Sequence, residues 1–121
     1  MLNAINWFEI PAVDLERAIA FYSAVLGKDI IRGEFMGQPQ GFFPSDREGV
    51  TGAIIKRDYE TPSNSGALIY LNAGDNLDGA IAKVEPSGGK VVLPKTDLGQ
   101  FGFASIIIDS EGNRIGLHSQ S

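Results

Sequence analysis

Residues 7–22, WFEIPAVDLERAIAFY, change from a strand pattern to a helix pattern within a few positions. From Asn3 to Glu9 apolar and polar side chains alternate, which predicts a strand with two different faces. Asp14 is a predicted N-cap, because its side-chain oxygen can accept hydrogen bonds from the free amides of the first helical turn. Apolar residues recur at helical spacing up to Gly27, where a left-handed backbone can end the helix: Leu15, Ala18, Ile19, Tyr22, Val25 and Leu26. The stretch therefore predicts a strand, a turn and an amphipathic helix.

The second half of the chain repeats this plan. Arg17–Ala20 differs from Gly79–Ala82 only in its first residue. The same shift in residue number aligns Gly27-Lys28 with Gly89-Lys90. Further strands are predicted over residues 28–35, 40–44 and 50–57, and then over 67–72, 90–96, 101–108 and 113–119, with a second helix over 76–85. The order of one strand, one helix and three strands thus occurs twice.

A connector separates the two halves at residues 60–65, which have the composition of a loop. It divides the chain into modules of about 1–59 and 66–121, but it is too short to separate independent domains. A chain of 121 residues can bury one core and has no room for a second. The sequence therefore predicts an α+β fold in which residues 1–121 form one domain of two βαβββ modules.

Composition and charge exclude several classes of function. Hydrophobic residues make up 43% of the chain and charged residues 21%, which is typical of a folded globular protein. The net charge is −5, and no cluster of Lys or Arg offers a basic face to nucleic acid or to an anionic membrane. The chain contains no cysteine, so disulfides and thiolate sites are absent. We expect a cytoplasmic protein that binds neither nucleic acid nor membranes, because no segment has the length of a bilayer span or the pattern of a signal peptide.

A second motif, Asp109-Ser110-Glu111-Gly112-Asn113-Arg114-Ile115, predicts a tight turn into the last strand. With the Val13-Asp14-Leu15-Glu16-Arg17-Ala18 and Phe21-Tyr22 segments, it resembles the vicinal oxygen chelate superfamily, which includes glyoxalase I, bleomycin-resistance proteins, fosfomycin-resistance enzymes and extradiol dioxygenases. The resemblance covers essentially the whole chain. It implies that the sheets of the two modules curl into a half-open cup with the helices outside. It also implies a homodimer in which strands of both subunits complete each cup.

The residues at the metal-binding positions of that superfamily have changed. In members that use a metal, His and Glu side chains on the strands hold a divalent ion. The first His corresponds to Trp7, whose indole N–H can only donate, and the last Glu corresponds to Gly116. The other two positions fall among residues without a ligand atom in the side chain: Ala67, Leu68 or Ile69, and Gly52, Ala53 or Ile54. Because the chain also has one His and no Cys, we predict a cup without a metal ion or other cofactor.

The side chains that remain on these strands are the predicted ligand-binding residues. Alternate residues of a strand share a face, so Glu9 should point the same way as Trp7, and Arg114 and His118 the same way as Gly116. The full set is Trp7, Glu9, Tyr70, Asn72, Arg114 and His118. All but Asn72 have a structural alternative: a core or dimer-interface aromatic for Trp7, an arginine partner or strand-edge exposure for Glu9, packing under a helix for Tyr70, a surface or hydrogen-bonded position for His118 and a turn-stabilising role for Arg114.

These residues predict a metal-free protein that binds a small organic molecule in a largely apolar cup, by shape, stacking and a few polar anchors. An alternative is a metal-independent lyase or isomerase with Glu9 as general base and His118 or Tyr70 as acid. A third is a metal-dependent glyoxalase-like lyase or dioxygenase that uses Glu9 and His118 as ligands. The candidate catalytic residues are therefore Glu9 and His118.

Overall fold

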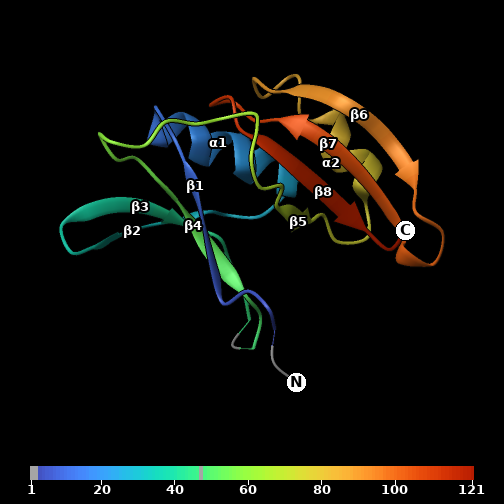
Figure 1. Ribbon diagram of the computed structural model, residues 1–121, viewed down its shortest axis with the longest axis horizontal. Coiled ribbons are helices and arrows are strands. Elements are labelled where there is room, and N and C mark those ends of the chain that lie inside the picture. The colour runs from blue at the N-terminus through green and yellow to red at the C-terminus, as the bar shows by residue number, and fades with distance from the viewer. Residues whose placement is uncertain (1–2, 47) are drawn as a thin grey trace.

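The computed structural model describes residues 3–46 and 48–121, and these residues form eight strands, two α-helices and one short 3-10 helix (Figure 1). The first module contains β1 (Trp7–Pro11), α1 (Leu15–Leu26), β2 (Ile31–Phe35), β3 (Gln38–Phe42) and β4 (Thr51–Ile55). The second contains β5 (Tyr70–Asn72), α2 (Leu77–Ala82), β6 (Lys90–Asp97), the 3-10 helix η1 (Gly99–Phe101), β7 (Phe103–Ile108) and β8 (Arg114–Ser119). Met1, Leu2 and Arg47 belong to the predicted domain but lie outside the described residues.

Each module builds a four-stranded open sheet with the same strand order. In the first sheet the order is β1-β4-β3-β2, and in the second it is β5-β8-β7-β6. The edge pairs β1/β4 and β5/β8 are parallel, whereas the other neighbours are antiparallel. The predicted α+β fold of two βαβββ modules is therefore confirmed.

The helix α1 begins and ends where the sequence predicts. Asp14 Oδ1 accepts a hydrogen bond from the Arg17 amide at 3.1 Å, and Gly27 has a φ of 64°. The predicted apolar stripe is buried at its centre, but Leu15 and Leu26 are only half-buried, and Phe21 is buried in addition. Phe21 is buried because its ring lies against Gly89 of the second module, so α1 is covered on two sides.

The two helices lie together between the sheets and form one core. The Asn76 side chain caps α2 by accepting from the Gly79 amide at 2.9 Å. α2 then packs against β6, β7 and β8 on one side and against α1 on the other, and in Figure 1 it lies behind β7 and β8. The buried cluster contains residues of both modules, such as Ile10 and Ile54 from the first and Leu71 and Leu117 from the second. Each sheet therefore keeps one face on this core and turns the other away from the helices.

The largest differences from the predicted elements concern their ends. β1 begins at Trp7, which pairs with the first residue of β4, and β5 begins only at Tyr70. Phe101 belongs to η1 and not to β7, because hydrogen bonds between Leu98 and Gly102 close a turn before the strand starts. In α2 the last turn tightens, since Lys83 and Val84 donate three residues back, and the helix ends earlier than predicted. Neither helix of the described residues could cross a membrane.

Candidate functional site

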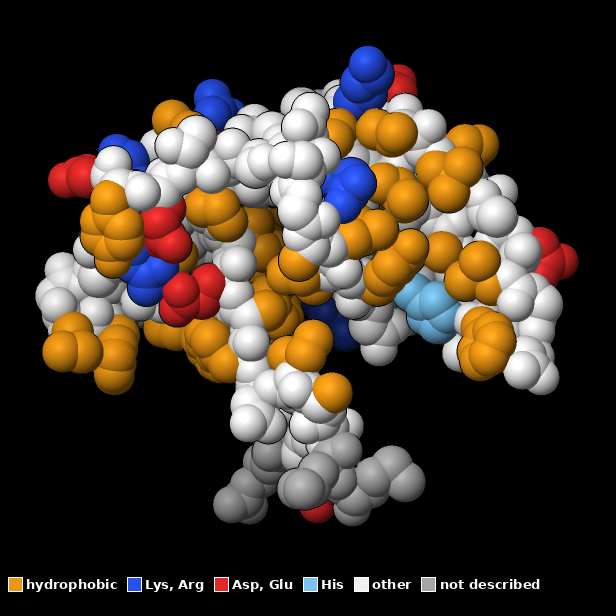
Figure 2. All heavy atoms as spheres, in the orientation of Figure 1, with side chains coloured by type: hydrophobic (Ala, Val, Ile, Leu, Met, Phe, Trp, Pro, Cys, Tyr) orange, Lys and Arg blue, Asp and Glu red, His pale blue; other side chains and the backbone are white. Residues whose placement is uncertain are grey.

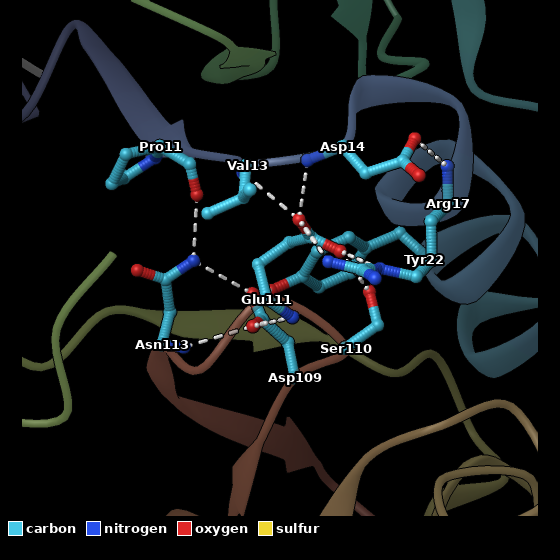
Figure 3. Close-up of polar contacts among 9 residues, drawn as sticks. All are labelled: Pro11, Val13, Asp14, Arg17, Tyr22, Asp109, Ser110, Glu111 and Asn113. Carbon is cyan, nitrogen blue, oxygen red and sulfur yellow. Dashed lines mark hydrogen bonds and ion pairs between the residues drawn. The ribbon is translucent and has the colours of Figure 1, made fainter. Parts of the chain in front are cut away.

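The turn between β7 and β8 holds the start of α1 through Glu111 (Figure 3). Its Oε1 accepts from the backbone amides of Val13 at 2.9 Å and Asp14 at 2.7 Å and from Arg17 Nη2 at 3.1 Å, and its Oε2 accepts from Arg17 Nε at 2.7 Å. The Glu111 side chain is fully buried, whereas that of Arg17 is half-exposed. Burial alone would raise the pKa of Glu111, but the hydrogen bonds from Arg17, the Asp14 amide and Ser110 outweigh it and lower the pKa. Glu111 is therefore an ionised link between the modules.

A second set of buried contacts surrounds Asp109 in the same turn. Its Oδ1 accepts from the amides of Glu111 at 2.8 Å and Asn113 at 2.9 Å, and its Oδ2 accepts from the Tyr22 hydroxyl. Asn113 Nδ2 donates to Asp109 and also to the Pro11 carbonyl at 2.8 Å, so it joins the turn to β1. Burial and the nearby Asp109 carboxylate raise the pKa of Tyr22 well above its ordinary value. The two motifs that marked the fold in the sequence therefore hold the modules together.

Trp7 and Glu9 lie on the open face of the first sheet. Ile10, their neighbour on the strand, is buried on the helix side, and Ala53 pairs with Glu9 on the open side. Trp7 is 45% exposed and its ring centroid lies 6.3 Å from that of Phe42. The indole is thus a surface aromatic, which leaves a ligand or an interface as its partner.

Glu9 is paired with Arg57, a residue that is not among the site residues predicted from the sequence. Arg57 Nη1 donates to Glu9 Oε1 at 2.8 Å and to Glu60 Oε1 at 2.7 Å. The hydrogen bond from Arg57, together with its charge, lowers the pKa of Glu9 despite partial burial. A carboxylate with a lowered pKa is a weaker general base. Arg57 could have been expected here, because it lies two residues beyond Ile55, the partner of Pro11 in the parallel pair of strands.

Four of the predicted ligand-binding residues lie on the open face of the second sheet. Leu71 and Leu117 point into the core, so their strand neighbours Tyr70, Asn72 and His118 point away from it. These three side chains line a cavity of about 480 Å³ together with Gly74 and Gln120, which the sequence did not single out. Tyr70 is 51% exposed and does not pack under a helix. The register of β5 and β8 thus brings His118 beside Tyr70 and Asn72, from which it is distant in sequence.

Arg114 lies at the other end of β8 and takes no part in this cavity. Its Nη2 donates to the Gly66 carbonyl at 2.7 Å, and its backbone amide donates to the Ser63 carbonyl at 3.2 Å. These bonds join the last strand to the segment that leads into β5. The structure accordingly shows Arg114 in the turn-stabilising arrangement that was its structural alternative.

This chain resembles a superfamily whose metal-using members bind a cation at known positions, and its own residues at those positions do not suit a cation. Gly116 has no side chain, and a Cβ at this position would overlap the Tyr70 ring, so the ring fills the space of the missing carboxylate. Ala53, the β4 residue that pairs with Glu9 on the open face, carries no ligand atom. Within residues 3–46 and 48–121, no three His, Asp or Glu side chains converge on a common point. The donor set therefore does not match a divalent metal site.

A wider cleft of about 900 Å³ runs between the modules beside β5. Tyr70 and Asn72 border this cleft as well as the smaller cavity, and most of the remaining lining is apolar, as with Ile5, Phe8 and Phe43. In Figure 2, hydrophobic side chains gather over both sheets, and a group of acidic and basic side chains lies among those at the left of the view. The cleft is thus mainly apolar, with polar groups among its lining residues.

Comparison with known proteins agrees with this architecture. The sequence profile of the Glyoxalase/Bleomycin resistance protein/Dioxygenase superfamily matches residues 4–117. The glyoxylase-like domain-containing protein of Didymella fabae is 32% identical over 104 residues, which cover 78% of this chain and 76% of that protein.

Two further relatives differ in length and in how closely they match. CFP32 of Mycobacterium tuberculosis is 28% identical over 115 residues, which are 93% of this chain but 44% of that protein, so the chain spans less than half of this relative. A glyoxalase/bleomycin resistance protein from Albidiferax ferrireducens has the same fold, with a TM-score of 0.78 at 18% identity over 98% of this chain and 100% of that chain.

Proposed function

Because this chain belongs to the Glyoxalase/Bleomycin resistance protein/Dioxygenase superfamily, we propose that it binds a small organic molecule on the open faces of its sheets without a metal ion. The observation that carries this proposal is the Tyr70 ring over Gly116. An aromatic ring takes the space where a metal-binding side chain would project. In the first module, Trp7 stands at the position that corresponds to a metal-binding His of the superfamily. Rings at these positions favour stacking on a flat ligand over chelation.

The size and chemistry of the surface suit such a ligand. Small-molecule sites commonly have volumes of about 300–1,000 Å³, with an apolar lining and a few polar groups that orient the ligand. The cavity of about 480 Å³ beside Tyr70 falls in this range and contains the polar groups of Asn72 and His118.

A homodimer would bring the two open faces into one site. Trp7 and Tyr70 belong to different sheets of one chain, and both faces expose large apolar side chains, among them Ile31 and Phe35 of β2. A second copy would cover these side chains and could set the Trp7 face of one subunit against the Tyr70 face of its partner. We therefore propose a shared cup between two subunits.

Binding can be tested with the chain's own fluorophore, because Trp7 is its only tryptophan. Native mass spectrometry of the protein purified from its source would identify a retained molecule, and that molecule would then be titrated while tryptophan emission is followed. We expect the emission to change and Trp7→Ala to weaken binding by about 1–3 kcal/mol, as for a buried aromatic anchor. A ligand that leaves the emission and the Trp7→Ala affinity unchanged would place the site elsewhere.

The metal-independent enzyme remains the second candidate, but Glu9 is a poor base in this setting. Its bond to Arg57 holds the carboxylate in the ionised form and lowers its pKa. Glu9→Gln separates the two functions, since a binding protein should keep most of its affinity whereas a general-base enzyme would bind and lose turnover.

A further inference from the structure

We propose that the cavity beside Tyr70 recognises a planar cis-amide, an N–H next to a C=O in one ring, with His118 Nδ1 as the acceptor and Asn72 Nδ2 as the donor. This inference rests on the proposed ligand-binding function and names the chemical class of the ligand. It follows from two backbone groups that orient the two side chains.

The tautomer of His118 is set by a carbonyl group. His118 Nε2 lies 2.6 Å from the Phe101 carbonyl oxygen, which can only accept a hydrogen bond. Nε2 must therefore carry the proton, and in the neutral ring Nδ1 is left as an acceptor. None of the described residues donates a hydrogen bond to Nδ1. His118 thus carries an acceptor without a partner among the described residues, and it lines the cavity together with Tyr70 and Asn72.

The orientation of Asn72 is set in the same way by an amide. The Gly74 backbone N–H can only donate, and it lies 2.8 Å from Asn72 Oδ1. The side-chain carbonyl therefore faces Gly74, and the NH₂ group is left as the outward donor. Among the described residues, no acceptor is hydrogen-bonded to Nδ2.

The two residues that carry these groups are neighbours in the sheet, and both lie next to an aromatic residue. Asn72 and His118 are register partners in the parallel pair β5/β8, whose strands are separated by about 4.8 Å. Tyr70 precedes Asn72 on the same face, with its ring over Gly116. A donor and an acceptor on neighbouring strands match the C=O and N–H of a lactam ring, and Tyr70 provides a surface on which that ring can stack.

The first test uses the fact that the chain has a single histidine. In protein labelled with ¹⁵N-histidine, long-range ¹H–¹⁵N spectra in slightly alkaline buffer distinguish the two neutral tautomers and the imidazolium. We expect the Nε2–H tautomer. A ring protonated at Nδ1, in either the neutral or the charged form, overturns the proposal.

The second test compares 2-pyridone, which has the cis-amide, with 1-methyl-2-pyridone, which lacks the N–H. We expect 2-pyridone to bind in about the millimolar range and to shift the Nδ1 signal in a saturable manner. The methylated compound should bind about tenfold more weakly, because it leaves the acceptor unpaired. Equal affinity for the two compounds keeps ligand binding as the function but overturns amide recognition. The absence of any shift in the His118 signals up to the solubility limit of 2-pyridone also overturns it.

A variant pair tests the donor. Asn72→Asp keeps an oxygen for the Gly74 amide but removes the NH₂ group, so 2-pyridone should bind about tenfold more weakly. Asn64→Asp introduces the same change on the exposed connector and should leave binding unchanged. If Asn72→Asp binds as tightly as Asn64→Asp, the amide group does not contact the ligand and the proposal is wrong. The proposed function would survive that result as long as the molecule retained by the native protein still changes Trp7 emission.

Discussion

Single residues in this chain take on roles that their sequence motif does not reveal. Glu111 is a buried carboxylate with five hydrogen-bond donors around it, one each from Val13, Asp14 and Ser110 and two from Arg17. The side chain is fully buried and accepts hydrogen bonds from Val13, Asp14 and Arg17 of the first module, so the carboxylate links the two modules. Its energetic value comes from a charge that is removed from water and matched by donors from the other module.

We predict that Glu111→Ala lowers the free energy of unfolding by about 2–4 kcal/mol, because it leaves the Val13 and Asp14 amides and Arg17 without their acceptor. Urea unfolding followed by circular dichroism measures the change. Glu85→Gln alters an exposed carboxylate and serves as the control, with no measurable effect expected. If Glu111→Ala lowers the free energy of unfolding no more than Glu85→Gln does, the Glu111 contacts do not hold the modules together.

The pH dependence of stability follows from the same carboxylate. Since folding lowers the pKa of Glu111, its contribution is complete above the unfolded-state value of about 4.5 and is lost as the pH falls through the lower folded-state pKa. The stability difference between the native protein and Glu111→Gln should therefore shrink as the pH decreases below about 4.5. Urea titrations at a series of pH values test this, and a constant difference would contradict it.

At the scale of elements, the backbone geometry of the β2–β3 hairpin and of the β5/β8 strand pair limits which side chains fit there. The β2–β3 hairpin turns at Met36 and Gly37, which both have positive φ, at 54° and 78°. Two left-handed residues in succession are typical of a type I′ turn, which suits Gly but strains a side chain such as that of Met. In the second sheet, β5 lies against β8 closely enough for the Tyr70 ring to cover Gly116.

For the hairpin, Met36→Gly should raise the free energy of unfolding by about 0.5–1 kcal/mol, because it relieves the left-handed strain. The Met36 side chain is 89% exposed, so little packing is lost. Met36→Ala retains the Cβ and should give no such gain. Thermal or urea unfolding of the native protein, Met36→Gly and Met36→Ala measures the differences in stability. Equal stability of all three would show that the left-handed backbone at Met36 is not strained.

For the second sheet, Gly116→Ala should destabilise the protein by about 1–2 kcal/mol, since the new methyl group displaces the Tyr70 ring. The same change in a Tyr70→Ala background should be much less harmful. A double-mutant cycle by urea unfolding yields the coupling energy. Additive effects would indicate that the ring does not occupy the space above Gly116.

At the scale of the whole molecule, the open faces are exposed apolar surfaces. Large exposed apolar areas usually mark binding sites for ligands or other proteins. Ile31 is 58% exposed on the face that also carries Trp7, and the opposite side of its sheet is covered by α1. This distribution is what a shared cup between two copies would require.

We predict a dimer at micromolar concentration, measured by size-exclusion chromatography with light scattering. Ile31→Glu should shift the protein toward the monomer, because it places a charge in the proposed interface, and should change the stability of the monomer by less than about 0.5 kcal/mol. Tyr59→Glu, at an exposed position of the loop after β4, should leave the dimer intact. A native protein that elutes as a monomer would contradict the shared cup but not the fold.

The sequence predicted much of the fold because its decisive signals are local. The N-cap at Asp14 and the helix end at Gly27 depend only on nearby residues, and both are confirmed. The strand predicted over Asn3–Glu9 instead begins at Trp7 and runs to Pro11. Phe21 and Phe101 were placed less well, because their environment comes from Gly89 and from a turn closed by Gly102. The single domain over residues 1–121, the ligand and the dimer stay predictions.

By itself, the sequence determined the class of the fold and the loss of the ligand atoms at Trp7 and Gly116, since both follow from residue types in a local pattern. Only the tertiary structure decided what replaced those atoms. The Tyr70 ring over Gly116, the Arg57 partner of Glu9 and the orientation of His118 by the Phe101 carbonyl each join residues that are distant in sequence. Such contacts depend on the register between strands and on turns that close in space, and no local pattern of side chains encodes these distances.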